Sequence, residues 1–142
     1  MRILICDDEI KMANMLGSKV RELVSNCEVH IYNHGSDLWN DLQKETCDVL
    51  LLDIDMPEIS GMDIASRLIT LDYEPLLVFI TSHDELVYDS LKFHPFGFIR
   101  KNYLDSEFQL IIEDCIQTME SKISYFAFNA SFSGYKSTLL NF

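Results

Sequence analysis

Five residues of this chain have the types and spacing needed to handle a phosphate group. Asp7 and Asp8 follow one short apolar run, and Asp53 follows another. Thr81 and Lys101 follow two further runs of the same kind. Carboxylates that converge without a cation raise one another's pKa, so such a cluster favours a bound cation. Oxygen ligands select a hard ion, and Mg²⁺ fits because it takes few carboxylates and keeps waters that a phosphate can replace.

Among these residues Asp53 is the natural nucleophile, because carboxylates form aspartyl phosphates. A lysine beside the cation adds a second positive charge, so we expect Lys101 to stabilise the transferring group. The Thr81 hydroxyl offers a neutral donor. The glycines stand at scattered positions, 17, 35, 61, 97 and 134, which excludes a glycine-rich nucleotide loop. The sequence therefore predicts phosphoryl chemistry without such a loop.

These side chains can meet only if the chain brings the ends of several strands to one edge. Short apolar runs alternate five times with segments of helical spacing. The runs predict strands at 2–6, 28–32, 48–52, 75–80 and 96–100. The segments that follow them predict helices at 12–24, 36–45, 62–71, 84–93 and 108–119.

Five strand–helix units predict an α/β fold, with a five-stranded parallel sheet and helices on both faces. Ligands of such sheets bind outside the carboxyl ends of the strands. The aspartates, the threonine and the lysine come just after the first, third, fourth and fifth predicted strands. We therefore expect all of them at one edge of the sheet.

Composition excludes several classes of partner. The chain has 142 residues, with 11 Lys plus Arg against 23 Asp plus Glu, for a net charge of −12. That length suits one domain. The charge disfavours direct contact of this segment with nucleic acid or with anionic lipid. No apolar run approaches the roughly 20 residues of a membrane span, and the acids at 7–9 are unlike a signal peptide.

The cysteines at 6, 27, 47 and 115 and the histidines at 30, 34, 83 and 94 show no metal-ligand spacing. A chain of this size rarely needs disulfides, so we expect reduced, mostly packed thiols and a cytoplasmic protein.

The tail from about residue 123 differs from the rest. It contains six Phe or Tyr residues with Ser, Asn and Gly between them, and no acid. Its weak alternation predicts strands. We favour a linker followed by the first strands of a second domain that these residues do not complete. An extension packed on the first domain is the alternative.

Four motifs together resemble the signatures of the bacterial response regulator receiver domain. They are Ile5-Cys-Asp-Asp-Glu9, Leu51-Leu-Asp-Ile-Asp-Met-Pro57, Phe79-Ile-Thr-Ser82 and Phe98-Ile-Arg-Lys101. The resemblance covers residues 1–121 and implies a flavodoxin-like receiver fold with strand order 2-1-3-4-5. It implies phosphoryl transfer to Asp53 from a sensor histidine kinase, in a protein that is a switch and not an enzyme.

The resemblance also implies roles for individual residues. Asp8 and Asp53 would ligate Mg²⁺ directly, Asp7 through water, and Asp55 through its backbone carbonyl. Thr81 would bond a phosphoryl oxygen.

Phe98 would change rotamer to report phosphorylation, although a core role fits it equally well. The expected output is a surface for homodimerisation or the release of a C-terminal effector.

A second resemblance concerns the effector. Asp53–Pro57, Thr81–Glu85 and the segment 126–142 are similar to response regulators that carry a LytTR-type DNA-binding domain. This implies a receiver at 1–121, and at 122–142 a linker with the opening strands of an incomplete LytTR-type domain. DNA would be bound only through that effector, in the service of transcription regulation.

Two departures from the receiver pattern bear on the site. Asn102 follows Lys101 where the family usually has Pro, often after a cis bond. A non-proline cis bond costs roughly 2.5–4 kcal/mol, so we expect a trans bond, which puts the placement of Lys101 in question. Asp55 adds an acid beside Asp53, and His83 stands two residues after Thr81. We expect Asp55 and His83 to modulate the rate at which the acyl phosphate is hydrolysed.

Simpler structural roles stay open for several of these residues. Asp7 or Asp8 could cap the following helix. Ser82 forms a capping-box pattern with Glu85, so we expect Ser82 to be structural and Thr81 to be the functional hydroxyl. His83 could be an exposed loop residue.

Two other functions compete with the phosphorylated switch. One is a receiver-like interaction module that needs no phosphorylation, for which Asn102 is the hint. The other is a phosphatase resembling the haloacid dehalogenases, through Asp53-Ile-Asp55. That family needs its motif on the first strand and a substrate cap, for which this chain has no length.

Overall fold

The computed structural model describes residues 1–140, and it describes side chains for residues 1–123. Its centre is a five-stranded parallel sheet in the order β2-β1-β3-β4-β5, as predicted. The strands are β1 (Arg2–Cys6), β2 (Glu28–Tyr32), β3 (Val49–Asp53), β4 (Leu76–Thr81) and β5 (Gly97–Arg100). The expected α/β fold with the flavodoxin-like strand order 2-1-3-4-5 is confirmed.

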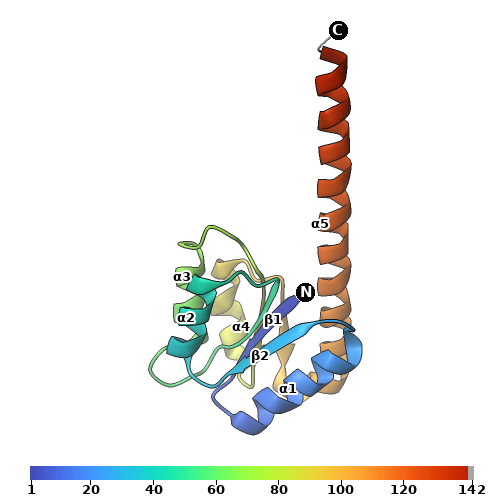
Figure 1. Ribbon diagram of the computed structural model, residues 1–142. Coiled ribbons are helices and arrows are strands. Elements are labelled where there is room, and N and C mark those ends of the chain that lie inside the picture. Colours follow the sequence, from blue (N-terminus) through green and yellow to red (C-terminus); the bar gives the residue numbers. More distant parts are fainter. Residues whose placement is uncertain (141–142) are drawn as a thin grey trace.

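Helices cover both faces of the sheet, with α1 and α5 on one side and α2, α3 and α4 on the other (Figure 1). Their bounds are α1 (Ile10–Leu23), α2 (Gly35–Lys44), α3 (Gly61–Leu68), α4 (Glu85–Ser90) and α5 (Leu104–Leu140). Two short 3₁₀ helices, η1 (Leu91–Phe93) and η2 (Lys101–Tyr103), flank β5.

Burial on both faces explains why the central strands are apolar between their end residues. On β1, Ile3 and Ile5 pack under α1 and α5, while Leu4 and Cys6 pack under α2 and α3. All five residues of β3 are likewise buried. Each of the buried Val, Leu and Ile side chains contributes about 1.5–3 kcal/mol of hydrophobic stabilisation. The sheet is therefore a rigid base for the residues at its ends.

The tail corrects one prediction. α5 continues to Leu140 and projects past the sheet (Figure 1), so the strands expected after residue 121 are wrong. No proline follows Pro95, and Gly134 costs only about 1 kcal/mol relative to alanine, so nothing in the sequence stops the helix. The aromatic alternation was too weak to override this. Residues 141–142 of the predicted tail lie outside the described residues.

Two further expectations concern the surface and the thiols. Among the described residues, no helix has both the length and the apolar character that crossing a membrane requires. All four cysteines are free thiols, and Cys6, Cys47 and Cys115 are buried.

Candidate functional site

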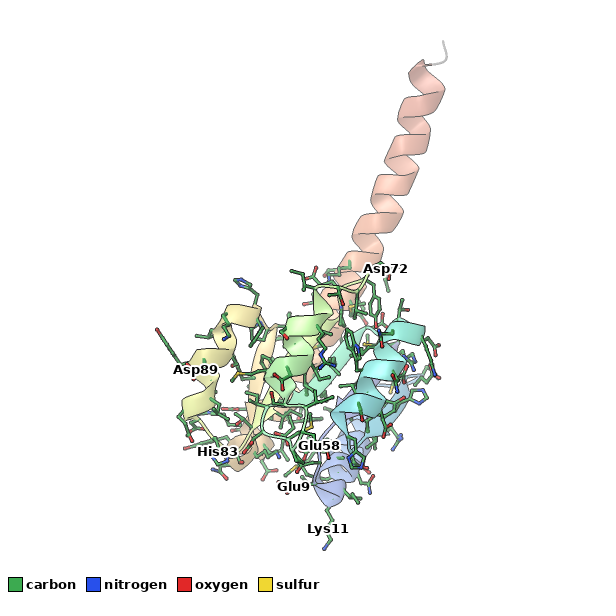
Figure 2. The ribbon with its side chains drawn as sticks, turned by 90° about the vertical axis from the view of Figure 1, so that its left-hand side faces the viewer. Glu9, Lys11, Glu58, Asp72, His83 and Asp89 are labelled. Atoms are coloured by element: carbon green, nitrogen blue, oxygen red, sulfur yellow. The ribbon has the colours of Figure 1, made fainter. Side chains whose placement is uncertain are left out.

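Three aspartates meet at the carboxyl ends of β1 and β3. Asp7, Asp8 and Asp53 each offer a carboxylate oxygen, and these oxygens lie within 4.8 Å of one another. Asp7 and Asp53 are buried while Asp8 is exposed, so the cluster opens to solvent on one side. Figure 2 shows this end of the molecule, with the neighbouring Glu9 and His83 labelled, far from Asp72. The predicted convergence of the aspartates is thus observed.

The loop after β3 is fixed by close backbone contact. The Gly61 N–H donates to the Ile54 carbonyl at 2.9 Å, and a Cβ at Gly61 would lie 2.2 Å from the Asp53 carbonyl oxygen. The Ser60 hydroxyl and the Asp63 carboxylate form a capping box that starts α3 at Gly61. The first turn of α3 therefore locks the end of β3, and with it Asp53.

Asp7 has both a structural and a chemical contact. Its Oδ1 accepts the Glu9 N–H at 2.9 Å, which supports the start of α1. Its buried Oδ2 accepts no hydrogen bond and instead faces the Lys101 ammonium at 3.0 Å. The N-cap of α1 is Glu9, with no side-chain cap bond, so neither Asp7 nor Asp8 is the N-cap residue of this helix.

Lys101 reaches the cluster despite the absence of proline after it. Its side chain is 7% exposed, and Nζ lies 3.4 Å from Asp53 Oδ2 and 3.5 Å from Glu9 Oε1. The Lys101–Asn102 bond is trans, as expected. Burial lowers the pKa of Lys101, but Asp7 and Asp53 outweigh this and raise it. The lysine is therefore a charged partner of the aspartates.

One lysine does not offset the charge of the cluster. Burial, and then the charge of Asp7, raise the pKa of Asp53 to about 8, although Lys101 opposes the shift. An all-oxygen donor set, in which the buried Asp7 Oδ2 accepts no hydrogen bond and has only the Lys101 ammonium as its charged partner, fits a hard divalent cation. A cation held by Asp7, Asp8 and Asp53 would keep Asp53 ionised and nucleophilic.

Thr81 lies buried at the end of β4, beside the cluster's strands. Its Oγ1 accepts the His83 N–H at 2.9 Å, so it makes the turn into α4. The capping box expected from Ser82 is wrong, because α4 begins after Asp84 and Asp84 has no side-chain cap bond. Thr81 satisfies the backbone donor instead, and Ser82 is exposed.

Asp55 and His83 form an exposed pair just after the ends of β3 and β4. His83 Nε2 lies 3.4 Å from Asp55 Oδ2, and its Nδ1 lies 3.4 Å from Glu85 Oε1. The Asp55 N–H donates to Asp53 Oδ1 at 3.3 Å, which ties this group to the predicted phosphoacceptor. The role of the Asp55 carbonyl as a ligand stays a prediction.

Phe98 is half-buried on β5, and its ring stacks on Phe79 with centroids 6.0 Å apart. It packs in the core beneath α3 and α4, near Leu86 and Phe93. The change of rotamer on phosphorylation stays a prediction.

Sequence reasoning missed two contributors to the site. Glu9 contacts Lys101, and its position next to Asp8 was a usable signal. Arg100 and Glu107 form an ion pair behind Lys101. The spacing of Arg100 and Glu107 did not predict this ion pair, because the two residues belong to different elements.

Comparison with known proteins gives a consistent result. The family model described as "Response regulator receiver domain" matches residues 3–113. The transcriptional regulatory protein YpdB of Escherichia coli K12 is 27% identical over 106 residues, 75% of this chain and 43% of YpdB. The response regulator protein TodT of Pseudomonas putida is 32% identical over 84 residues, 59% of this chain and 36% of TodT. The chain thus spans less than half the length of these relatives.

Solved structures agree on the fold. The response regulatory domain of mrkE from Klebsiella pneumoniae superposes with a TM-score of 0.77 at 25% identity, covering 85% of this chain and 99% of that one. TrrA from Thermotoga maritima, solved in complex with Mg(2+)-BeF, gives a TM-score of 0.71 at 22% identity, covering 80% and 97%.

Proposed function

This chain belongs to the response regulator receiver domain family, and we propose that it accepts a phosphoryl group on Asp53 in the presence of Mg²⁺. The observation that carries the proposal is the meeting of Asp7, Asp8 and Asp53 with the buried ammonium of Lys101. Receiver domains are signalling domains of two-component systems rather than classical enzymes. The phosphoryl donor is proposed to be a phosphohistidine of a sensor histidine kinase.

Each side chain of the cluster has a separate role in the proposed phosphoryl transfer. An Asp53 carboxylate oxygen attacks phosphorus, and the phosphorus–nitrogen bond of the donor breaks with its electron pair staying on the imidazole. Lys101 would turn from Asp53 to the phosphoryl oxygens, and Asp8 and Asp53, with Asp7 through water, would hold the metal. Bound there, Mg²⁺ would neutralise charge on the transferring group. The likeness to TrrA, solved with Mg(2+)-BeF, supports a metal at this place.

Thr81 and Phe98 are proposed to turn phosphorylation into a change of shape. To donate to a phosphoryl oxygen, Thr81 must turn its hydroxyl away from the His83 carbonyl, to which it now donates. A shift of Oγ1 toward the phosphoryl group would also strain the bond that it accepts from the His83 N–H in the turn into α4, and this biases α4 and Phe98. Moving a two-state element from 1:99 to 99:1 needs about 5.5 kcal/mol of differential stabilisation. The proposed output is homodimerisation or release of the effector.

The effector is proposed to regulate transcription. YpdB is a transcriptional regulatory protein more than twice the length matched here. The sequences of Asp53–Pro57 and Thr81–Glu85 resemble those of response regulators with a LytTR-type DNA-binding domain. This supports an effector domain of that type, which would follow the receiver at 1–121. DNA contact would belong to that domain, since the receiver at 1–121 holds all 23 acidic residues but only 9 of the 11 Lys and Arg residues, for a net charge of −14. A cytoplasmic location is part of the same proposal.

The competing functions have less support. A receiver that needs no phosphorylation was suggested by Asn102, but Lys101 reaches Asp53 without a proline after it. A dehalogenase-like phosphatase would need Asp53 on the first strand, and it lies at the end of β3.

Intact-protein mass spectrometry after incubation with acetyl phosphate tests the proposal. The wild type should gain one phosphoryl group with Mg²⁺ and none with EDTA. Asp53→Ala should gain none under either condition. Asp72→Ala, at the far end of the molecule, is the matched control and should behave as the wild type. A wild type that stays unmodified by acetyl phosphate and by phosphorylated histidine kinases would contradict the proposal.

A further inference from the structure

Lys101 stands at the junction of β5 and η2, where the backbone must be held for its side chain to reach the aspartates. A Lys-Pro bond, usual in similar domains, is replaced here by a trans Lys101–Asn102 bond. An asparagine restricts the backbone far less than a proline does. Something else must therefore hold the ammonium within 3.0 Å of Asp7.

The residue before Lys101 is bound through both its main chain and its side chain. The Arg100 N–H donates to Glu107 Oε2 at 2.9 Å, and Arg100 Nε donates to Glu107 Oε1 at 2.7 Å. Arg100 Nη2 donates to the same Oε1. A carboxylate that accepts three hydrogen bonds from one residue fixes both its backbone and its guanidinium.

Two further contacts complete the arrangement. The Arg100 guanidinium lies over the Tyr103 ring, 4.1 Å from its centroid, so it also covers the last residue of η2. Arg100 Nη1 lies 3.9 Å from Asp84 Oδ2, at the start of α4. The Arg100 side chain thus contacts the chain on both sides of Lys101.

Glu107 is not needed to dock α5. Phe108 and Ile112 are buried under the sheet, and Ile111 packs so closely on Gly97 that a Cβ there would meet it at 2.3 Å. The apolar face of α5 therefore fixes the helix, and the carboxylate of Glu107 is free to serve the Arg100 backbone.

We propose that Arg100 and Glu107 are positioning residues that hold Lys101 at the aspartate cluster in place of a Lys-Pro bond. Without them the 3₁₀ turn η2 can rotate, and the lysine ammonium leaves Asp7 and Asp53. The part of this inference that concerns phosphorylation rests on the proposed function. The part that concerns Mg²⁺ rests on cation binding by the three aspartates and not on phosphoryl transfer.

The inference predicts two effects of opposite sign for Glu107→Gln. The rate of phosphorylation by acetyl phosphate should fall about tenfold, because small misplacements of a group that contacts the transferring phosphoryl are costly. The affinity for Mg²⁺ alone, measured by calorimetry without any phosphoryl donor, should rise about threefold. A displaced lysine no longer opposes the cation at the three carboxylates. A variant that is merely less well folded would show both a lower rate of phosphorylation and a lower affinity for Mg²⁺.

Matched variants make the test specific. Glu113→Gln removes the same charge from an exposed site on the same helix, where Glu113 pairs with Gln109, and should change neither quantity. In a Lys101→Ala background, Glu107→Gln should no longer change Mg²⁺ affinity, because its effect passes through the lysine. Arg100→Lys, which cannot make the bidentate contact, should act like Glu107→Gln and serves if the latter does not fold.

The outcomes distinguish failure of the inference about Arg100 and Glu107 from failure of the proposed phosphoryl acceptance on Asp53. Unchanged Mg²⁺ affinity in Glu107→Gln and in Arg100→Lys would overturn the inference, as would an effect that persists in Lys101→Ala. If the wild type takes up no phosphoryl group, the proposed function fails, while the calorimetric comparison still decides the role of Arg100 and Glu107.

Discussion

Gly61 packs against the backbone of Asp53 so closely that any side chain at position 61 would collide with the Asp53 carbonyl oxygen. The distance from a Cβ at Gly61 to that oxygen would be 2.2 Å, and to Ile54 Cα 2.8 Å. Both obstacles are backbone atoms of the segment that carries the proposed phosphoacceptor. The glycine is therefore required by the close approach of α3 to the end of β3.

Gly61→Ala should accordingly move the end of β3. We expect a loss of about 1–3 kcal/mol in the free energy of unfolding, typical of overpacking, and slower phosphorylation of Asp53. Gly17→Ala is the matched control. It meets only the flexible end of Ile31 and gains helix propensity, so its stability should be equal or higher. Urea unfolding of both variants provides the comparison, and equal losses would argue against the backbone collision.

Neutralising Asp53 should stabilise the metal-free protein. The raised pKa of Asp53 means that its charged form is disfavoured in the fold, whereas the unfolded chain ionises freely at pH 7. We therefore expect Asp53→Asn to unfold at higher urea in EDTA, by about 1–4 kcal/mol. Saturating Mg²⁺ should reduce this advantage, because the wild type alone retains the full ligand set.

Asp72→Asn, remote from the site, serves as the control for this comparison and should show no dependence on Mg²⁺. An Asp53→Asn variant less stable than the wild type in EDTA would contradict the idea that the cluster carries unbalanced negative charge.

The fold and the aspartate cluster could be predicted because they depend on patterns local to each strand. β1 and β3 are buried on both faces, so they are continuous apolar runs that end at Asp7 and Asp53. The rule that ligands meet the carboxyl ends of parallel strands then places the aspartates together.

Other features depend on a choice between alternative local structures or contacts, and only the folded chain decides that choice. Ser82 and Thr81 are neighbouring hydroxyls, and only the geometry of the turn decides which of them bonds His83. Arg100 and Glu107 are seven residues apart, a spacing with no meaning until β5 and α5 are packed. The tail alternates like a strand but contains no residue that ends α5, and helix continuation prevails.

Asp55→Asn should lengthen the lifetime of the proposed acyl phosphate. Asp55 lies 3.4 Å from His83, so a carboxylate oriented by a histidine stands beside Asp53. Such a pair can orient or deprotonate the attacking water, although its exposure limits the gain. We expect dephosphorylation to slow about three- to tenfold in Asp55→Asn, and to a lesser extent in His83→Asn.

Loss of radiolabel from the phosphorylated proteins would measure this rate. The control is Glu58→Gln, because Glu58 is an exposed residue of the same loop. Equal rates in all variants would remove Asp55 from the mechanism.

Asp41 should confer a stability that disappears in acid. Its carboxylate accepts two hydrogen bonds from Arg2 Nη2, at 2.7 and 2.8 Å, and one from the Tyr32 hydroxyl. Burial raises the pKa of Asp41, but these bonds outweigh burial and lower it. A lowered folded pKa means that the stabilisation is complete above the unfolded value of about 3.9 and is lost as the pH falls through the folded value. Asp41→Asn should therefore cost about 1.5–3 kcal/mol at pH 7.

The pH profile distinguishes this ion pair from simple packing. In urea unfolding, the difference between the wild type and Asp41→Asn should be constant from pH 7 to pH 5. It should shrink below about pH 4, as the wild-type carboxylate protonates. Asp37→Asn, in the first turn of the same helix, has no such partner among the described side chains and should give no comparable difference. A difference that stays constant down to pH 3 would mean that the shape of Asp41, and not its charge, holds α2 to the start of β1.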